Sequence, residues 1–178
     1  MSFHLKSLNV VKSENNDANC VYCGFPSEYC CLSDGYNIPV CYFCAANFML
    51  NNMSDKDKIS FFPDIPINII SHMQRAVAVA LHNGEKREIA EKIHQWLFAH
   101  AKFVEDSQWN TSSPRAFDSV LSRMSEDNQI NFFSELYVVL EPNNIDLLEI
   151  EKLKDLMPKP KFWHEHYQET KKLSFEGE

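Results

Sequence analysis

The chain of 178 residues has a formal net charge of −8 and 44% hydrophobic residues, including 13 phenylalanines, so it can bury a core. No stretch approaches the about 18 uncharged apolar residues of a membrane span, and the first residues lack the pattern of a signal peptide, so we expect neither. Residues 13–55 contain no Lys or Arg. Because nucleic-acid binding depends on cations that neutralise phosphates, this segment is poorly suited to bind DNA or RNA.

The N-terminal segment predicts a strand followed by a loop. Residues 3–12 partly alternate between apolar and polar side chains, which indicates an edge strand. Residues 13–19 are polar and indicate a loop. This loop leads into the cysteine-rich part of the chain, which begins at Cys20.

Four of the six cysteines form two Cys-x-x-Cys pairs, Cys20 with Cys23 and Cys41 with Cys44. Residues 24–40 separate the pairs, a spacing within the about 15 to 20 residues that are typical of zinc sites. Two intervening residues let both sulfurs of a pair face one ion, and two pairs complete a closed tetrahedral Cys₄ site. We therefore predict one structural Zn²⁺ bound by these four cysteines. A disulfide or a redox-active pair would not explain why the motif occurs twice.

The other two cysteines, Cys30 and Cys31, leave two interpretations open. Either could replace one of the four ligands, or both could be small buried hydrophobic residues, as free cysteines often are. The second interpretation is favoured because neither residue has the Cys-x-x-Cys spacing. Cysteines in zinc spacing without a secretory signal also favour a reducing, cytoplasmic location.

The order of elements around the cysteines predicts a small zinc module. Residues 41–50 are mostly apolar and predict a helix that carries the second pair in its first turn. A knuckle, then a loop or hairpin, then such a helix is the treble-clef arrangement. We expect residues 1–55 to form the N-terminal strand and the zinc module, and residues 56–178 to form a helical region packed on it as one compact domain. The expected fold class is α+β, mainly helical, with a treble-clef or HNH-like Cys₄ module followed by a bundle of amphipathic helices.

Beyond the zinc module, apolar periodicity predicts helices. The first begins near Asp64-Ile65-Pro66 and ends at Gly84, the second covers residues 85–105, and the third begins with Ser113 as N-cap and Pro114 at the first helical position. A fourth ends at Pro142, a fifth covers residues 146–156, and a last amphipathic piece covers residues 161–173. The expected buried face of the first helix is Ile67, Ile70, Met73, Val77 and Leu81, and that of the second is Ile89, Ile93, Trp96, Leu97, Phe103 and Val104. The third helix is expected to bury Phe117, Val120, Leu121 and Met124. The fourth is expected to bury Ile130, Phe133, Leu136 and Val139 or Leu140.

No catalytic motif emerges from the sequence, so we do not expect an enzyme. His164 and His166 could contact a metal, but on a helix two residues at this spacing face different ways. The double cysteine motif resembles the framework of zinc-stabilised HNH nucleases, whose chemistry requires a histidine in the middle segment to activate water. Residues 24–40 contain no histidine, so hydrolysis at this site is not expected. An HNH-like or zinc-finger nucleic-acid binder or nuclease acting in DNA transfer remains the alternative hypothesis.

Several segments, taken in order, resemble the DotN family, also called IcmJ. These are C-V-Y-C-G-F, N-I-P-V-C-Y-F-C-A, F-F-P-D-I-P, N-T-S-S-P-R-A-F-D-S-V-L, and L-K-D-L-M-P followed by K-P-K-F. The resemblance runs from about residue 20 to about residue 170, and the ordered later segments carry it because the double cysteine motif alone is common. The chain departs from the family in its shorter middle segment and its N-terminus, so the host system, secretion or conjugation, stays open.

The resemblance implies a role in assembly rather than in catalysis. DotN proteins are cytoplasmic parts of the coupling complexes of type IVB (Dot/Icm-like) secretion or conjugation systems, and they bind the C-terminal extension of the coupling ATPase beside other adaptors. The resemblance therefore implies a non-enzymatic, zinc-stabilised adaptor. Such a protein would be cytoplasmic, held at the inner membrane through its partner, and would neither bind nucleic acid nor insert into the membrane.

Overall fold

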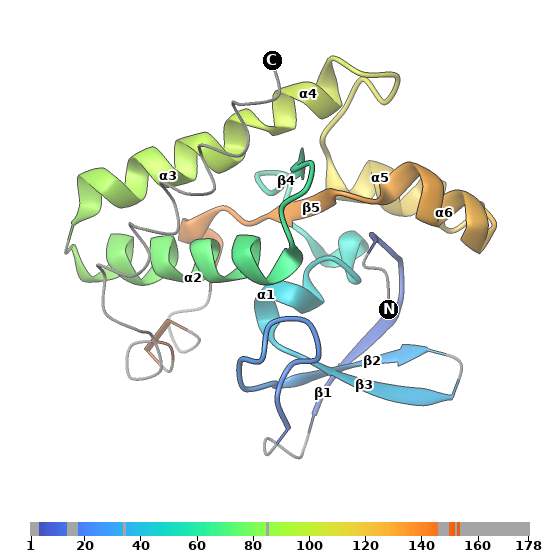
Figure 1. Ribbon diagram of the computed structural model, residues 1–178, viewed down its shortest axis with the longest axis horizontal. Helices are drawn as coiled ribbons and strands as arrows, with labels where there is room; N and C mark the ends of the chain where they lie inside the picture. Colours follow the sequence, from blue (N-terminus) through green and yellow to red (C-terminus); the bar gives the residue numbers. More distant parts are fainter. Residues whose placement is uncertain are drawn as a thin grey trace.

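The computed structural model describes residues 4–13, 18–33, 35–84, 86–145, 150, 151 and 153 (Figure 1). Their fold is α+β, with helices and two small antiparallel sheets. A three-stranded sheet and a short helix form the N-terminal part, and the longer helices and a two-stranded sheet follow later in the chain.

The three-stranded sheet has the order β1-β2-β3. It consists of β1 (Asn9–Lys12), β2 (Tyr29–Ser33) and β3 (Tyr36–Val40), and both pairs of neighbours are antiparallel. The edge strand predicted over residues 3–12 is thus present in the last part of that range. Gly35, between β2 and β3, has a φ of 82°, a backbone conformation that glycine adopts without steric cost.

The helix predicted from Cys41 onward begins directly after β3. It is α1 (Tyr42–Ala45), with Cys41 as its N-cap, and a short 3₁₀ helix, η1 (Leu50–Asn52), follows. The helix is shorter than predicted because the Asn47 side chain donates hydrogen bonds to backbone carbonyls of α1, at 3.2 and 3.3 Å. Such side-chain bonds to the backbone compete with helix continuation.

A two-stranded sheet takes the place of the second half of the fourth predicted helix. Strand β5 (Leu136–Val139) pairs antiparallel with β4 (Lys58–Phe61), and neither was predicted. Helix α6 covers Glu126–Phe133, and Glu135 then has a φ of 64°, so the helix expected from Leu136 onward is wrong. The residues of β5 are all buried, and a continuous apolar run rich in β-branched and aromatic residues favours a strand covered on both faces.

Helix α2 (Ile67–Asn83) follows the predicted pattern closely. It ends at Gly84, whose φ of 73° is the left-handed conformation predicted for the C-cap. Pro66 is the N-cap, directly before the first helical residue. Of the predicted apolar face, Leu81 is partly buried and the others are buried: Ile67, Ile70, Met73 and Val77.

The single helix predicted over residues 85–105 is divided at His100 into α3 (Arg87–Ala99) and α4 (Ala101–Glu105). Nδ1 of His100 donates a hydrogen bond to the carbonyl of Trp96 at 2.8 Å. This side-chain bond occupies a carbonyl that would otherwise accept a backbone hydrogen bond of the helix. Side chains that insert into the hydrogen-bond ladder of a helix interrupt or bend it. The His100 ring also stacks on Phe62, with 4.6 Å between the centroids.

Helix α5 (Pro114–Leu121) begins as predicted, with Ser113 as N-cap and Pro114 at the first helical position. Its residues Phe117 and Leu121 are buried, and Met124 just beyond it is partly buried. The Phe117 ring packs against Trp109, with 5.1 Å between the centroids. This aromatic contact joins α5 to the loop before it.

Some apolar residues predicted to be buried are exposed instead. Phe103 in α4 is 62% exposed, and three others are 36 to 37% exposed: Ile89, Val120 and Ile130. Apolar periodicity thus overestimated how many residues of each helix are buried.

The N-terminal part packs against the later helices and β5, and in Figure 1 helix α1 lies between the three-stranded sheet and α2. The amide of Leu5 donates to the carbonyl of Phe133, and the amide of Val138 donates to the Asn47 side chain at 2.7 Å. Helices α2 and α3 form an antiparallel pair on the side of α1 that faces away from the three-stranded sheet.

The end of the described chain contains the 3₁₀ helix η2 (Pro142–Asn144) and a few helical residues, Ile150, Glu151 and Leu153. The fifth predicted helix otherwise lies outside the described residues, as do the last amphipathic piece, residues 161–173, and the histidines at 164 and 166. None of the helices in the described ranges combines the length and the apolarity that crossing a bilayer requires.

Candidate metal centre

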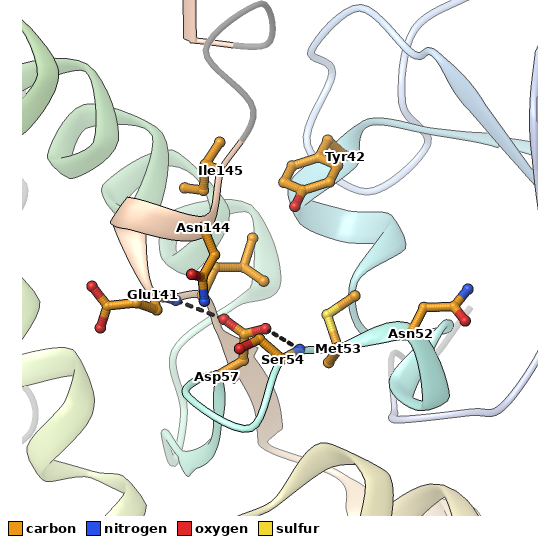
Figure 2. A pocket seen from close by; sticks show the side chains of 9 residues that line it. Tyr42, Asn52, Met53, Ser54, Asp57, Glu141, Asn144 and Ile145 are labelled. Atoms are coloured by element: carbon orange, nitrogen blue, oxygen red, sulfur yellow. Dashed lines mark hydrogen bonds between the residues drawn. The ribbon is translucent and has the colours of Figure 1, made fainter.

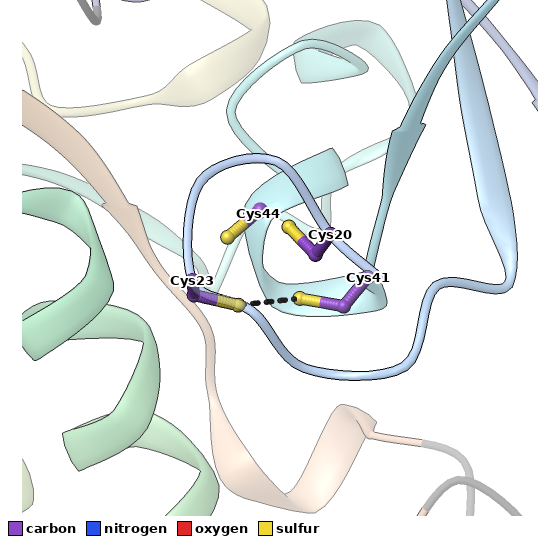
Figure 3. Close-up of side chains that lie close together, drawn as sticks. All are labelled: Cys20, Cys23, Cys41 and Cys44. Carbon is purple, nitrogen blue, oxygen red and sulfur yellow. Dashed lines mark hydrogen bonds between the residues drawn. The ribbon is translucent and has the colours of Figure 1, made fainter. Parts of the chain in front are cut away.

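The four cysteines of the two Cys-x-x-Cys pairs come together at one point of the structure. Figure 3 shows Cys20 and Cys23 on one loop, with Cys41 and Cys44 at the start of α1, and their sulfurs converge. The four Sγ atoms all lie within 4.8 Å of one another. Cys23 is half-buried and the other three are buried. The cluster could therefore hold one metal ion.

Local backbone geometry places the first pair. Gly24 follows Cys23 with a φ of 71°, which lets the chain turn back on itself. The amide of Gly24 donates to the carbonyl of Cys20 at 2.8 Å, and the amide of Cys20 donates to the carbonyl of Phe25 at 2.7 Å. These bonds close a tight loop that points both sulfurs to the same side.

The second pair depends on the start of helix α1. Cys41 is the N-cap, and its carbonyl accepts a hydrogen bond from the amide of Ala45 at 2.8 Å. One helical turn then brings Cys44 to the same face. The two halves of the site thus come from a loop and a helix start that lie on either side of the β2–β3 hairpin in sequence.

The spacing of the sulfurs fits one tetrahedral ion. With metal–sulfur bonds of about 2.3 Å, the sulfurs of a regular tetrahedral site lie about 3.8 Å apart. The Sγ atoms of Cys23 and Cys41 are 3.5 Å apart. Hydrogen bonding with the Cys20 thiol lowers the pKa of Cys23, whereas burial raises the pKa of Cys41. Because like charges this close repel, all four sulfurs can be thiolates together only around a cation.

Cys30 and Cys31 lie on β2, outside the cluster. Cys31 is buried, as expected for a small hydrophobic residue, whereas Cys30 is only half-buried. Burial raises the pKa of the Cys31 thiol to about 12, so this sulfur stays protonated at neutral pH. Neither position supports the interpretation in which one of these residues replaces a ligand.

We expect Cys30→Ala and Cys31→Ala each to retain one metal ion per chain, because neither sulfur belongs to the cluster. Metal analysis of the purified variants by mass spectrometry measures this directly, with Cys44→Ala as the matched variant that should lose the metal. Loss of stoichiometric metal in either of the first two variants would show that the ligand set is different.

The charged residue nearest to the cluster escaped prediction. Arg75 of α2 is fully buried, and its Nη2 donates to Sγ of Cys23 at 2.9 Å and to Sγ of Cys41 at 2.8 Å. The zinc module itself has no Lys or Arg, so its nearest cation comes from the helical region. The one sequence signal is that Arg75 is the only Asp, Glu, Lys or Arg in the sequence of α2.

Further contacts fix the Arg75 guanidinium. Nη1 donates to Nδ1 of His72 at 2.8 Å, and the guanidinium lies over the rings of Phe25 and Phe43, 4.2 and 5.3 Å from their centroids. Burial opposes the charge, but the neighbouring sulfurs outweigh this effect and raise the pKa of Arg75. Arg75 is therefore a cation held against the candidate metal ligands.

A second residue of α2 contacts the cluster. The hydroxyl of Ser71 lies 3.2 Å from Sγ of Cys44, and Ser71 is buried. Ser71 and Arg75 are four residues apart, which places them on the same face of the helix. This face of α2 thus contacts three of the four sulfurs: Cys23, Cys41 and Cys44.

A pocket of about 110 Å³ lies elsewhere, where Tyr42 of α1 faces the loops around Asp57 and Glu141 (Figure 2). The Asp57 carboxylate accepts hydrogen bonds from the backbone amides of Ser54, at 2.7 Å, and Glu141, at 2.8 Å. Burial raises the pKa of Asp57 above its ordinary value. Each oxygen of this carboxylate accepts a hydrogen bond from a different loop, so Asp57 connects the two loops and has a structural role.

Together, the fold and the cluster define an α+β protein with a candidate Cys₄ metal centre. No protein-family model matches the chain, and no curated protein matches it significantly.

Proposed function

We propose that the protein is a non-enzymatic, zinc-stabilised adaptor subunit of a type IV secretion coupling complex, which binds the C-terminal extension of the coupling ATPase. The metal centre is supported by the convergence of Cys20, Cys23, Cys41 and Cys44. The partner is proposed from the resemblance to the DotN family, which covers most of the sequence.

Zinc is the metal that this donor set fits best. Four thiolates are soft ligands, which select zinc, copper(I) or iron–sulfur clusters over hard cations. A single tetrahedral S₄ site among buried sulfurs favours Zn²⁺ in a structural role, since a catalytic zinc keeps one coordination position open. The order of knuckle, β2–β3 hairpin and helix α1 supports the treble-clef arrangement that the sequence predicts.

The surface of the protein is compatible with a binding role. The net charge is −8, and residues 13–55 contribute no basic side chain. Exposed apolar side chains occur on α4 and α6, where Phe103 is 62% and Phe132 is 49% exposed. A partner segment with apolar anchors flanked by basic residues would match both properties, by helix-in-groove or extended docking. Charge complementarity of this kind speeds association and weakens as salt rises.

We expect the zinc-loaded protein, co-expressed with the C-terminal extension of the coupling ATPase, to elute with it as a stoichiometric complex in size-exclusion chromatography without nucleotide. The reason is that an adaptor of this kind needs a stable interface, usually above about 1,200 Å² in total. Repeating the run at several salt concentrations measures the electrostatic contribution.

The same preparations distinguish the adaptor proposal from the alternative of an HNH-like nucleic-acid binder or nuclease. Two folded, zinc-loaded components that elute separately at micromolar concentration would contradict the adaptor proposal. Tight binding or nicking of duplex or single-stranded DNA at physiological salt with magnesium would instead support the HNH-like hypothesis.

A further inference from the structure

Arg75 is a buried cation whose guanidinium donates hydrogen bonds to sulfurs of the cysteine cluster. Its side chain is fully buried, and its Nη2 lies 2.9 Å from Sγ of Cys23 and 2.8 Å from Sγ of Cys41. It forms no ion pair with a carboxylate among the described residues. Because burial of an unpaired ion is strongly unfavourable, the folded protein requires negative charge at the cluster.

This requirement distinguishes the possible states of the four cysteines. Four thiols or two disulfides are neutral and would leave Arg75 without a counter-charge. Four thiolates around one divalent cation carry a total charge of about −2, which Arg75 reduces to about −1. The position of Arg75 therefore agrees with a metal–thiolate centre and with neither neutral state.

The hydrogen bonds of Arg75 are distributed unevenly over the cluster. Cys23, the half-buried member, and Cys41 each accept a bond from Nη2, at 2.9 and 2.8 Å. A thiolate that accepts charge-assisted hydrogen bonds is stabilised and is a weaker nucleophile. The most accessible sulfur of the cluster is thus one of the two that Arg75 stabilises.

We propose that Arg75 of α2 is a charge-compensating residue of the metal centre, which tightens metal binding and protects the Cys23 thiolate from electrophiles. Ser71 assists through its contact with Cys44. The proposal rests on the metal centre of the proposed function but is independent of the adaptor role. It also makes metal binding and the docking of α2 mutually stabilising, because each supplies charge that the other needs.

The position of α2 supports this coupling. Gln74, next to Arg75, donates from Nε2 to the carbonyl of Val138 at 2.9 Å and accepts from the amide of Leu140 at 2.9 Å. Successive residues of one helix thus hold β5 and the cysteine cluster. A change at the metal centre is therefore transmitted to a helix that is fixed to the two-stranded sheet.

The test compares zinc affinity and zinc release in Arg75→Met, Arg75→Lys and the wild type. Arg87→Met is the matched control, because Arg87 is exposed and pairs with Glu91 of its own helix. Affinity is measured by competition with a chromogenic chelator, after circular dichroism has shown that each variant is folded. Removing a residue that orients metal ligands typically lowers metal affinity about 10- to 100-fold, and we expect this for Arg75→Met.

Reactivity provides a readout that a purely structural role would not change. N-ethylmaleimide adds to a thiolate when the sulfur bonds to one carbon of its double bond and water supplies a proton to the other carbon. We expect zinc release by this reagent to be faster in Arg75→Met than in the wild type, with Cys23 carrying the first adduct in peptide mapping. The control Arg87→Met should match the wild type in both measurements.

Arg75→Lys keeps the test decisive if Arg75→Met does not fold. Lysine retains the charge but cannot reproduce the planar fork of donors, so we expect an intermediate affinity and an intermediate release rate. Wild-type values for a folded Arg75 variant in both measurements would overturn the inference. Wild-type protein that purifies without zinc would instead contradict the metal centre itself, which separates the two failures.

Discussion

Replacing Cys41 with serine is expected to release the zinc ion and to unfold the protein. Structural zinc bound by cysteines contributes on the order of 10 kcal/mol, which is comparable to the about 5 to 15 kcal/mol of a typical domain. The substitution also removes one of the two sulfurs that Arg75 contacts, at 2.8 Å. Loss of this hydrogen bond to a charged group adds a cost of about 1.5 to 3 kcal/mol. Metal content and thermal unfolding by circular dichroism measure both losses.

Cys30→Ser is the matched control, since Cys30 is half-buried on β2 and lies outside the cluster. Incubation of the wild type with a strong chelator under reducing conditions should reproduce the effect of the Cys41 substitution. A zinc-free wild-type protein with an unchanged unfolding transition would refute this prediction. Disulfides within the two cysteine pairs under reducing conditions would refute it as well.

The features that the sequence predicts correctly depend on local interactions. The spacing of Cys20, Cys23, Cys41 and Cys44 follows from ligand geometry, and the structure brings these sulfurs together. Gly84 ends α2 and Pro114 begins α5 because their backbone preferences act within one turn. Such signals need no knowledge of the rest of the fold.

The features that the sequence does not predict depend on distant partners. The apolar residues of β5 also fit a helical period and therefore predict a helix, whereas the partner strand β4 lies about 75 residues earlier in the chain. The break of the helix at His100 depends partly on Phe62, on which its ring stacks. Both errors are cases in which tertiary contacts override local patterns.

The metal centre shows the same division between local and distant information. Its candidate ligands are evident from their spacing, whereas Arg75 follows the first cysteine pair by about 50 residues and belongs to another element. The absence of Lys and Arg from residues 13–55 gave no sign of a cation beside the cluster. The compensating charge is present, but it reaches the sulfurs only through the packing of α2 on α1.

Asn47 provides a further polar connection between α1 and the rest of the fold. Asn47 is buried, with its Nδ2 bonded to the carbonyls of Phe43 and Cys44 and its Oδ1 bonded to the amide of Val138 at 2.7 Å. Its side chain therefore links α1, which carries half of the candidate metal ligands, to β5. Loss of this link should weaken both the helix end and the sheet.

We expect Asn47→Ala to lower the free energy of unfolding by about 3 kcal/mol, because a buried amide left without its partner costs about 1 to 3 kcal/mol and carbonyl bonds are lost as well. For a chain of this size, that corresponds to a fall in melting temperature of about 6 to 12 °C. Asn51→Ala is the control, since Asn51 is exposed and substitutions at such positions stay within about 0.5 kcal/mol. Thermal and urea unfolding of the zinc-loaded variants measure the difference. Equal stability of the two variants would mean that Asn47 does not couple α1 to β5, and that the metal-binding helix is held by α2 and apolar packing alone.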